Sequence, residues 1–343
     1  MVTLAAQATD GALFKNIYGT ISQTERPGFF CTALTGQSDF NICINADLSV
    51  SCNCMDIDGS GRLGDLKSMT FENIFYGKIA NEFRETLNNQ KLPILRCVRC
   101  HDLNICRKDN SQTPSLPDRG ILIETNANCN LSCITCGRLR RTSTNFQMST
   151  YELIDILKQL KKFDLKMVHL YAFGEPFISK EIYDQVEAIR KIMPHVFVTA
   201  STNGMLIDSD EKYLAALLMD NIIFSIDGSS QETCRRYQVG IDFRRSYENM
   251  CELVKLRKNS KQRKPYIIWK YLVFRWNDRG DDINKAIDLA RRAEVDALAF
   301  WFTKSPFYGM SWRFFLNRQW QTLAPLRDHK RVLYFGDNPG IYL

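Results

Sequence analysis

The sequence lacks any hydrophobic run that approaches the roughly 18 apolar residues of a membrane-spanning helix. Its opening stretch, MVTLAAQATDGALFK, has no basic segment of the kind that begins a secretion signal. Neither an internal repeat nor a low-complexity tract is present, which argues against repeat and fibrous architectures. The four histidines form no pair at a metal-binding spacing. From these absences we expect a cytoplasmic globular protein without a membrane-embedded part.

Cysteine, by contrast, is abundant, with 12 residues. A reducing cytoplasm keeps thiols free, so clustered cysteines there indicate metal binding rather than disulfides. Three of them, Cys129, Cys133 and Cys136, lie together in the stretch ETNANCNLSCITCGR. Two isolated residues, Cys234 and Cys251, are expected to be ordinary buried thiols. The others precede the triplet, at positions 31, 43, 52, 54, 97, 100 and 106.

A polar segment, RKDNSQTPSLPD at residues 107–118, separates the two cysteine groups. Its two prolines, Pro114 and Pro117, oppose both helix and strand, so we predict a domain boundary here. The predicted parts are a small domain at 1–118, a larger domain at 119–303 and a closing segment at 304–343. The formal net charge of +7 belongs to the later parts, because residues 1–118 carry 11 Lys and Arg against 13 Asp and Glu.

Beyond the boundary, short apolar runs alternate with amphipathic stretches. The expected strands are 121–125, 166–173, 196–201, 222–227, 266–274 and 296–302. Runs this rich in Ile, Val, Phe and Leu are typical of parallel strands buried on both faces, with helices between them. Right-handed crossovers would curl them into a partial (βα)6 barrel of the α/β class, with its functional loops at the carboxyl ends of the strands.

The cysteine triplet follows the first expected strand. Four thiolates would close a tetrahedral zinc site or saturate an iron–sulfur cubane, whereas three leave one iron of a [4Fe-4S] cluster open to another ligand. A zinc site that recruits a remote fourth ligand remains an alternative. Three arginines, Arg138, Arg140 and Arg141, follow the loop directly and are candidate contacts for an anionic cofactor or substrate group.

Over residues 119–303 the sequence resembles the radical S-adenosylmethionine (SAM) enzymes, in which a C-x3-C-x2-C loop follows the first barrel strand. The resemblance implies that Cys129, Cys133 and Cys136 hold a [4Fe-4S] cluster whose open iron chelates SAM. It also implies that the GEP turn, Gly174, Glu175 and Pro176, contacts the amino group of that cofactor. The family often has an aromatic residue where this chain has Thr135.

Two further turns resemble segments that line SAM in this family: STNG after the third expected strand and SIDG after the fourth. The candidate polar contacts are Asn203 and Ser225. The alternative is that Asn and Asp, including Asp227, simply build turns before glycine.

The early cysteines occur in an order that resembles the SPASM or twitch auxiliary-cluster domains of radical SAM enzymes, although such domains usually follow the barrel. The resemblance implies a second [4Fe-4S] cluster on Cys31, Cys52, Cys97 and Cys100. Cys54 competes with Cys52, because alternate residues of an extended strand share a face. A tetrahedral zinc site is the alternative here too.

These features predict an enzyme that cleaves SAM reductively to a 5′-deoxyadenosyl radical and abstracts hydrogen from an unactivated C–H bond. We expect a sugar-like or nucleotide-linked natural-product intermediate as substrate, with peptide modification as the runner-up. The expected partners are a small-molecule or peptide substrate and an electron donor such as flavodoxin or ferredoxin, with neither membrane nor nucleic acid. A rival class is a non-catalytic iron–sulfur or zinc protein that binds nucleic acid through the basic later half.

Overall fold

The computed structural model describes residues 28–40, 42–54, 56–106, 112–141, 145–303, 305–313 and 331–335. Its centre is a run of parallel strands that neighbour one another in chain order. They are β6 (Gly120–Ile123), β7 (Met167–Leu170), β8 (Phe197–Thr202), β9 (Asn221–Ser225), β10 (Tyr266–Val273) and β11 (Ala297–Phe302). Each coincides with one of the six expected runs, so the predicted α/β architecture with a parallel sheet is confirmed.

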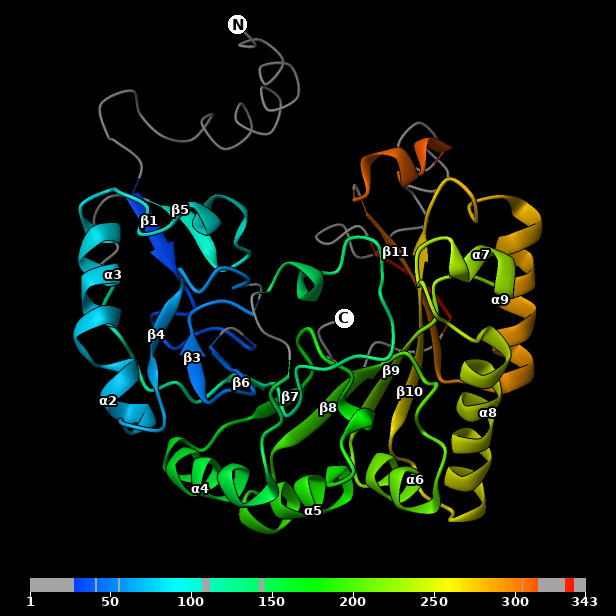
Figure 1. Ribbon diagram of the computed structural model, residues 1–343, viewed down its shortest axis with the longest axis horizontal. Helices are drawn as coiled ribbons and strands as arrows, with labels where there is room; N and C mark the ends of the chain where they lie inside the picture. The colour runs from blue at the N-terminus through cyan, green and yellow to red at the C-terminus, as the bar shows by residue number, and fades with distance from the viewer. Residues whose placement is uncertain are drawn as a thin grey trace, which may run out of the picture.

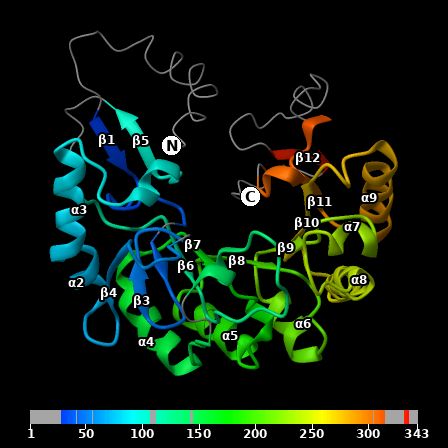
Figure 2. The same ribbon diagram turned by 45° about the horizontal axis from the view of Figure 1, so that its top comes forward.

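Helices connect these strands and lie on the outer side of the curved sheet (Figures 1 and 2). They are α4 (Thr150–Leu160), α5 (Ile182–Ile192), α6 (Asp210–Leu217), α7 (Gln231–Arg235), α8 (Phe243–Asn259) and α9 (Gly280–Ala293). The sequence sets the start of α4 through a capping box between Ser149 and Glu152. No helix within the described ranges is long and apolar enough to cross a membrane.

The early residues form a module beside β6 (Figure 1). Its elements are β1 (Gly28–Cys31), β2 (Cys43–Ile44), β3 (Ser49–Ser51), β4 (Arg62–Asp65), α2 (Phe71–Phe75), α3 (Lys78–Asn88), the 3-10 helix η1 (Leu95–Arg99) and β5 (Leu103–Cys106). Strand β2 pairs in parallel with β6, and β3 and β4 continue the same sheet. The early module and the barrel therefore share one hydrogen-bonded sheet and one hydrophobic core, and the domain boundary at 107–118 stays a prediction.

At the opposite edge, β12 (Arg331–Phe335) pairs antiparallel with β11, and a short 3-10 helix, η5 (Phe307–Gly309), precedes it. The closing segment that we predicted at 304–343 is described only at 305–313 and 331–335. The aromatic and basic residues at 314–330 lie outside the described residues.

The two faces of the sheet differ in composition. Large side chains such as Trp269, Tyr271 and Phe300 are fully buried in the main core. The alternate residues of β9 to β11 form a separate, smaller cluster of Ile223, Ile268, Ala297 and Ala299. Because side chains alternate along a strand, this cluster marks the concave face.

Candidate cofactor and metal sites

The cysteine triplet lies in the loop that joins β6 to α4. The loop is anchored by the segment that follows α7. The amide of Ser132 donates to the carbonyl of Val239 (2.9 Å). The amide of Ile134 donates to the carbonyl of Tyr237 (3.0 Å). These two hydrogen bonds join the loop after β6 to the chain after α7. The cysteine loop is thereby held at the carboxyl ends of the strands.

The three thiols influence one another electrostatically. Burial is the main cause that raises the pKa of Cys133 far above its ordinary value, and Asp227, Cys136 and Cys129 raise it further. Burial also raises the pKa of Cys129 to about 11, again with a contribution from Cys136. Thiols in such surroundings ionise together only when a cation is bound between them. This donor set therefore fits a cationic metal group.

The residue beside the last cysteine, Thr135, receives aromatic support from elsewhere in the chain. Its hydroxyl lies 3.1 Å from the hydroxyl of Tyr237. The Tyr237 ring packs against Phe274, with 4.7 Å between ring centroids, and Phe274 stacks on Trp276. Sequence reasoning missed Tyr237, because no spacing rule links it to the triplet 102 residues earlier.

The GEP turn contacts the same loop through its backbone. A Cβ atom on Gly174 would lie 1.7 Å from the carbonyl oxygen of Asn126, so only glycine allows this approach. The amide of Glu175 donates to the carbonyl of Asn128 (2.8 Å). Pro176 begins the 3-10 helix η4 (Pro176–Ile178) and is buried. The turn is thereby fixed against the residues that immediately precede Cys129.

The carboxylate of Glu175 is 3% exposed and is used within the protein. It accepts hydrogen bonds from the hydroxyl of Thr202 (2.7 Å) and the amide of Asn203 (2.8 Å). The amide of Phe177 is its third donor (3.2 Å). Burial raises its pKa, although these hydrogen bonds act in the opposite direction. Glu175 therefore ties the end of β7 to the end of β8.

The structure brings Asn203 to the cysteine loop. Its side-chain amide donates to the side-chain oxygen of Asn130, next to Cys129, at 2.9 Å. Ser225 lies further along the sheet, where its hydroxyl is 3.1 Å from that of Ser201. Both predicted polar contacts thus lie at the carboxyl ends of neighbouring strands, around the mouth of the concave face.

An ion pair that sequence reasoning missed locks this arrangement. The carboxylate of Glu124, which is almost fully buried, binds the guanidinium of Arg141 at 2.8 Å. It also accepts from the amides of Phe173 (3.0 Å) and Gly174 (3.3 Å). Arg141, one of the three arginines predicted to meet an anion, is therefore committed to Glu124. A carboxylate at the end of the apolar run ILIET was the available signal.

The other two arginines behave differently. Arg138 donates to the carbonyl of Leu131 within the loop (2.6 Å), and its buried Nε has no hydrogen-bond partner among the described residues. Arg140 is exposed. A buried, unpartnered donor beside the triplet is consistent with a bound anionic or sulfur-rich group.

Charged side chains also reach the concave face. The ammonium of Lys270 lies 5.1 Å from the centroid of the Trp301 ring. Burial raises the pKa of Asp227 to about 6, while Lys270 lowers it and the amide of Leu272 donates to it at 3.0 Å. Asp227 is thus more than a turn residue. A lysine inside the apolar run YIIWKYLVF was a signal that the sequence reading left unused.

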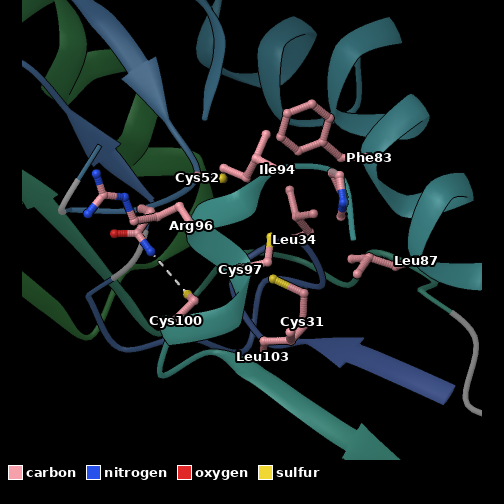
Figure 3. Close-up of a pocket in the computed structure, with 12 residues that line it drawn as sticks. Cys31, Leu34, Cys52, Phe83, Leu87, Ile94, Arg96, Cys97, Cys100 and Leu103 are labelled. Atoms are coloured by element: carbon pink, nitrogen blue, oxygen red, sulfur yellow. Dashed lines mark hydrogen bonds between the residues drawn. The ribbon is translucent and has the colours of Figure 1, made fainter. Parts of the chain in front are cut away.

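A second cysteine group surrounds a cavity in the early module (Figure 3). Cys31, Cys52, Cys97 and Cys100 line it, together with apolar residues that include Leu34, Phe83, Leu87, Ile94 and Leu103. These are the four cysteines that the family resemblance implied. Burial raises the pKa of Cys52 well above its ordinary value, and the other three cysteines add to this effect. The cavity thus gathers thiols from three distant segments.

Cys54 does not line this cavity. The chain leaves β3 at Ser51 and turns, so Cys52 and Cys54 do not alternate along an extended strand. A Cβ atom on Gly61 would lie 3.1 Å from the sulfur of Cys52, which shows how closely the hairpin covers that thiol. Within the described ranges, no three His, Cys, Asp or Glu side chains are arranged to hold a single metal ion. The four cysteines of the early module instead surround a shared cavity.

The amino-acid sequence is similar to known proteins over part of its length. A model of the Radical SAM superfamily matches residues 123–267. A probable GTP 3′,8-cyclase of Methanosarcina mazei is 28% identical over 127 residues, which cover 34% of this chain and 35% of the relative. The tungsten-containing aldehyde ferredoxin oxidoreductase cofactor-modifying protein of Pyrococcus furiosus is 29% identical over 153 residues, which cover 43% of this chain and 41% of the relative.

The chain therefore spans between about a third and two fifths of the length of these curated relatives. Among solved structures, that of TYW1 with a lysine-pyruvate adduct bound aligns with a TM-score of 0.43 and 15% identity, covering 63% of this chain and 77% of that one.

Proposed function

We propose that this chain is a radical SAM enzyme, which cleaves SAM reductively and abstracts hydrogen from an unactivated C–H bond. The match of the Radical SAM superfamily model to residues 123–267 supports this proposal. The observation that carries the proposal is the convergence of Cys129, Cys133 and Cys136 with the GEP turn at the carboxyl ends of the parallel strands. A barrel mouth of this kind is where α/β barrels place their chemistry.

In this proposal Cys129, Cys133 and Cys136 hold a [4Fe-4S] cluster and leave one iron for SAM. When bound, the cluster supplies the electron that breaks a carbon–sulfur bond of SAM and yields the 5′-deoxyadenosyl radical. The chain's own residues orient the reactants. The turn from Gly174 to Pro176 is hydrogen-bonded to the cysteine loop. Asn203 also holds this loop, through its hydrogen bond to Asn130.

We further propose that the quartet of Cys31, Cys52, Cys97 and Cys100 holds an auxiliary [4Fe-4S] cluster. Four thiols that share one apolar cavity support this assignment. Because β2 pairs with β6, the module is joined to the strand from which the triplet loop leaves. An auxiliary cluster there would accept an electron from the substrate radical or help to bind the substrate.

The substrate that we propose is a sugar-like or nucleotide-linked intermediate carrying an anionic group. Lys270 is the register partner of Ser225 on the neighbouring strand, and the hydroxyl of Ser225 lies 3.1 Å from that of Ser201. A cation with neighbouring hydroxyl groups suits a phosphorylated or carboxylated, hydroxyl-rich molecule. A relative named as a probable GTP 3′,8-cyclase is in keeping with a nucleotide-linked substrate.

Anaerobic reconstitution with iron and sulfide tests the activity. Reduced protein should convert SAM into 5′-deoxyadenosine, measured by liquid chromatography. Cys133→Ala should abolish the product, whereas Cys251→Ala, a thiol on α8 remote from both groups in sequence, should retain it. A fully iron-loaded wild-type sample that leaves SAM intact would refute the proposed function. Salt-sensitive nucleic-acid binding in such a sample would instead favour the non-catalytic class.

A further inference from the structure

The cavity of the cysteine quartet is chemically uneven. Apolar side chains, among them Leu34, Phe83 and Leu87, line part of it. Cys100 has a polar neighbour, because the side-chain amide of Asn53 donates to its sulfur at 3.0 Å, shown by the dashed line in Figure 3. Arg96 also lines the cavity. The sulfur of Cys100 therefore has a directed side-chain donor, Asn53, in addition to the backbone amide of Asp102.

Local structure fixes Asn53 in this place. It lies in the turn that follows β3, directly after Cys52, and only 6% of it is exposed. The turn is closed by the amide of Asp56, which donates to the backbone carbonyl of Asn53 (3.2 Å). A buried amide costs free energy unless it is hydrogen-bonded, and the sequence could have placed an apolar residue here. The hydrogen bond to Cys100 satisfies this amide, so we infer that Asn53 acts on the sulfur of Cys100.

We propose that Asn53 is a positioning residue that stabilises the reduced state of the cluster held by this quartet and so raises its reduction potential. The inference rests on the proposed auxiliary cluster. Reduction adds negative charge, part of which falls on the cysteine sulfurs, and an N–H donor to a sulfur becomes stronger as that charge grows. Hydrogen bonds around cluster sulfurs are among the means by which proteins set the potential.

Two variants remove the donor while keeping the shape. Asn53→Leu is close in size and carries no donor, and Asn53→Asp is nearly identical in shape but accepts rather than donates. At a fixed potential we expect Asn53→Leu to lower the ratio of reduced to oxidised cluster about tenfold, which is about 59 mV for one electron. Asn53→Asp should lower it further, because it adds a negative charge.

The measurement uses the full chain with Cys129, Cys133 and Cys136 replaced by alanine, so that only the second group carries iron. The potential is read from electron paramagnetic resonance during a redox titration, with iron and sulfide counted in each sample. Asn104→Ala is the matched control, because Asn104 is an exposed asparagine on β5 of the same module. That variant should keep the wild-type potential.

A second measurement compares the parent with Asn53→Leu: the reduced parent should show hyperfine coupling from an exchangeable proton, lost in deuterium oxide, that Asn53→Leu lacks. The comparison separates the Asn53 proton from that of the Asp102 backbone amide, which also donates to Cys100. Equal potentials in all loaded proteins, or no such proton, would overturn the role of Asn53 and leave the auxiliary cluster intact. A parent protein that binds zinc or no metal at the quartet would overturn both proposals together. A loaded Asn53→Leu with a lowered potential and an unchanged Asn104→Ala would establish the role.

Discussion

The ion pair between Arg141 and Glu124 offers the sharpest test of how the cysteine loop is held. The perturbation is Arg141→Met, which keeps most of the side-chain volume but removes the charge. In the wild type only 13% of the Arg141 side chain and 1% of the Glu124 side chain are exposed. Removing Arg141 leaves the buried carboxylate of Glu124 without its cationic partner.

The expected cost follows from what remains around Glu124. Breaking a buried ion pair typically costs about 3–5 kcal/mol of unfolding free energy. Two backbone donors, the amides of Phe173 and Gly174, stay in place and keep part of the carboxylate solvation. Arg141→Met also loses the contact with the Phe173 ring, 5.1 Å from the guanidinium carbon. We therefore expect a loss of about 3 kcal/mol, at the lower end of this range.

Urea unfolding of the anaerobically purified protein, followed by tryptophan fluorescence, measures this loss. Arg140→Met is the control, because Arg140 belongs to the same loop and is exposed; it should change the unfolding free energy by less than about 0.5 kcal/mol. The double variant Glu124→Gln/Arg141→Met should recover at least about 1 kcal/mol of the loss. The reasoning fails if Arg141→Met lowers the unfolding free energy no more than the control does. It also fails if the double variant loses the sum of what Arg141→Met and Glu124→Gln each lose alone.

Two further predictions concern a glycine beside the cysteine loop and a buried histidine of β7. Gly174→Ala should severely reduce cluster retention and SAM cleavage, because its Cβ would meet the Asn126 carbonyl oxygen at 1.7 Å; Gly280→Ala, where nothing lies within 4 Å, should match the wild type in iron content and product. Burial lowers the pKa of His169 to about 4 from 6.5, so the unfolded chain binds the extra proton and stability is lost as the pH falls through this window. Relative to His169→Gln, the wild type should lose about 3 kcal/mol more between pH 7 and pH 4, and equal slopes in urea titrations would contradict this.

Much of the barrel could be predicted because its signals are local. The run YIIWKYLVF and its five counterparts are rich in Ile, Val, Phe and Leu, and the Ser149–Glu152 cap marks the start of α4 within four residues. The triplet was equally visible, since its three thiols lie within eight residues of chain. Short-range patterns of this kind predict the structure correctly where the local conformation that they favour is also the one adopted in the fold.

The features that sequence reasoning missed depend on contacts between distant residues. The pairing of β2 with β6 involves only two residues of β2, too few to show a period. Tyr237 approaches Thr135 only because the loop binds the chain after α7. The expectation that Cys52 and Cys54 share a face assumed an extended strand, whereas the chain turns after Ser51. In each case tertiary packing decided the outcome.

The most direct test of the central claim is electron–nuclear double resonance on the reduced, iron-loaded protein with SAM labelled by nitrogen-15 at its amino group. The account predicts a nitrogen coupling to the cluster of Cys129, Cys133 and Cys136, which requires one iron without a protein thiolate. It also predicts that the coupling is lost in Cys133→Ala. A triplet that holds a single zinc ion, or a cluster that shows no coupling to the labelled cofactor, would contradict it.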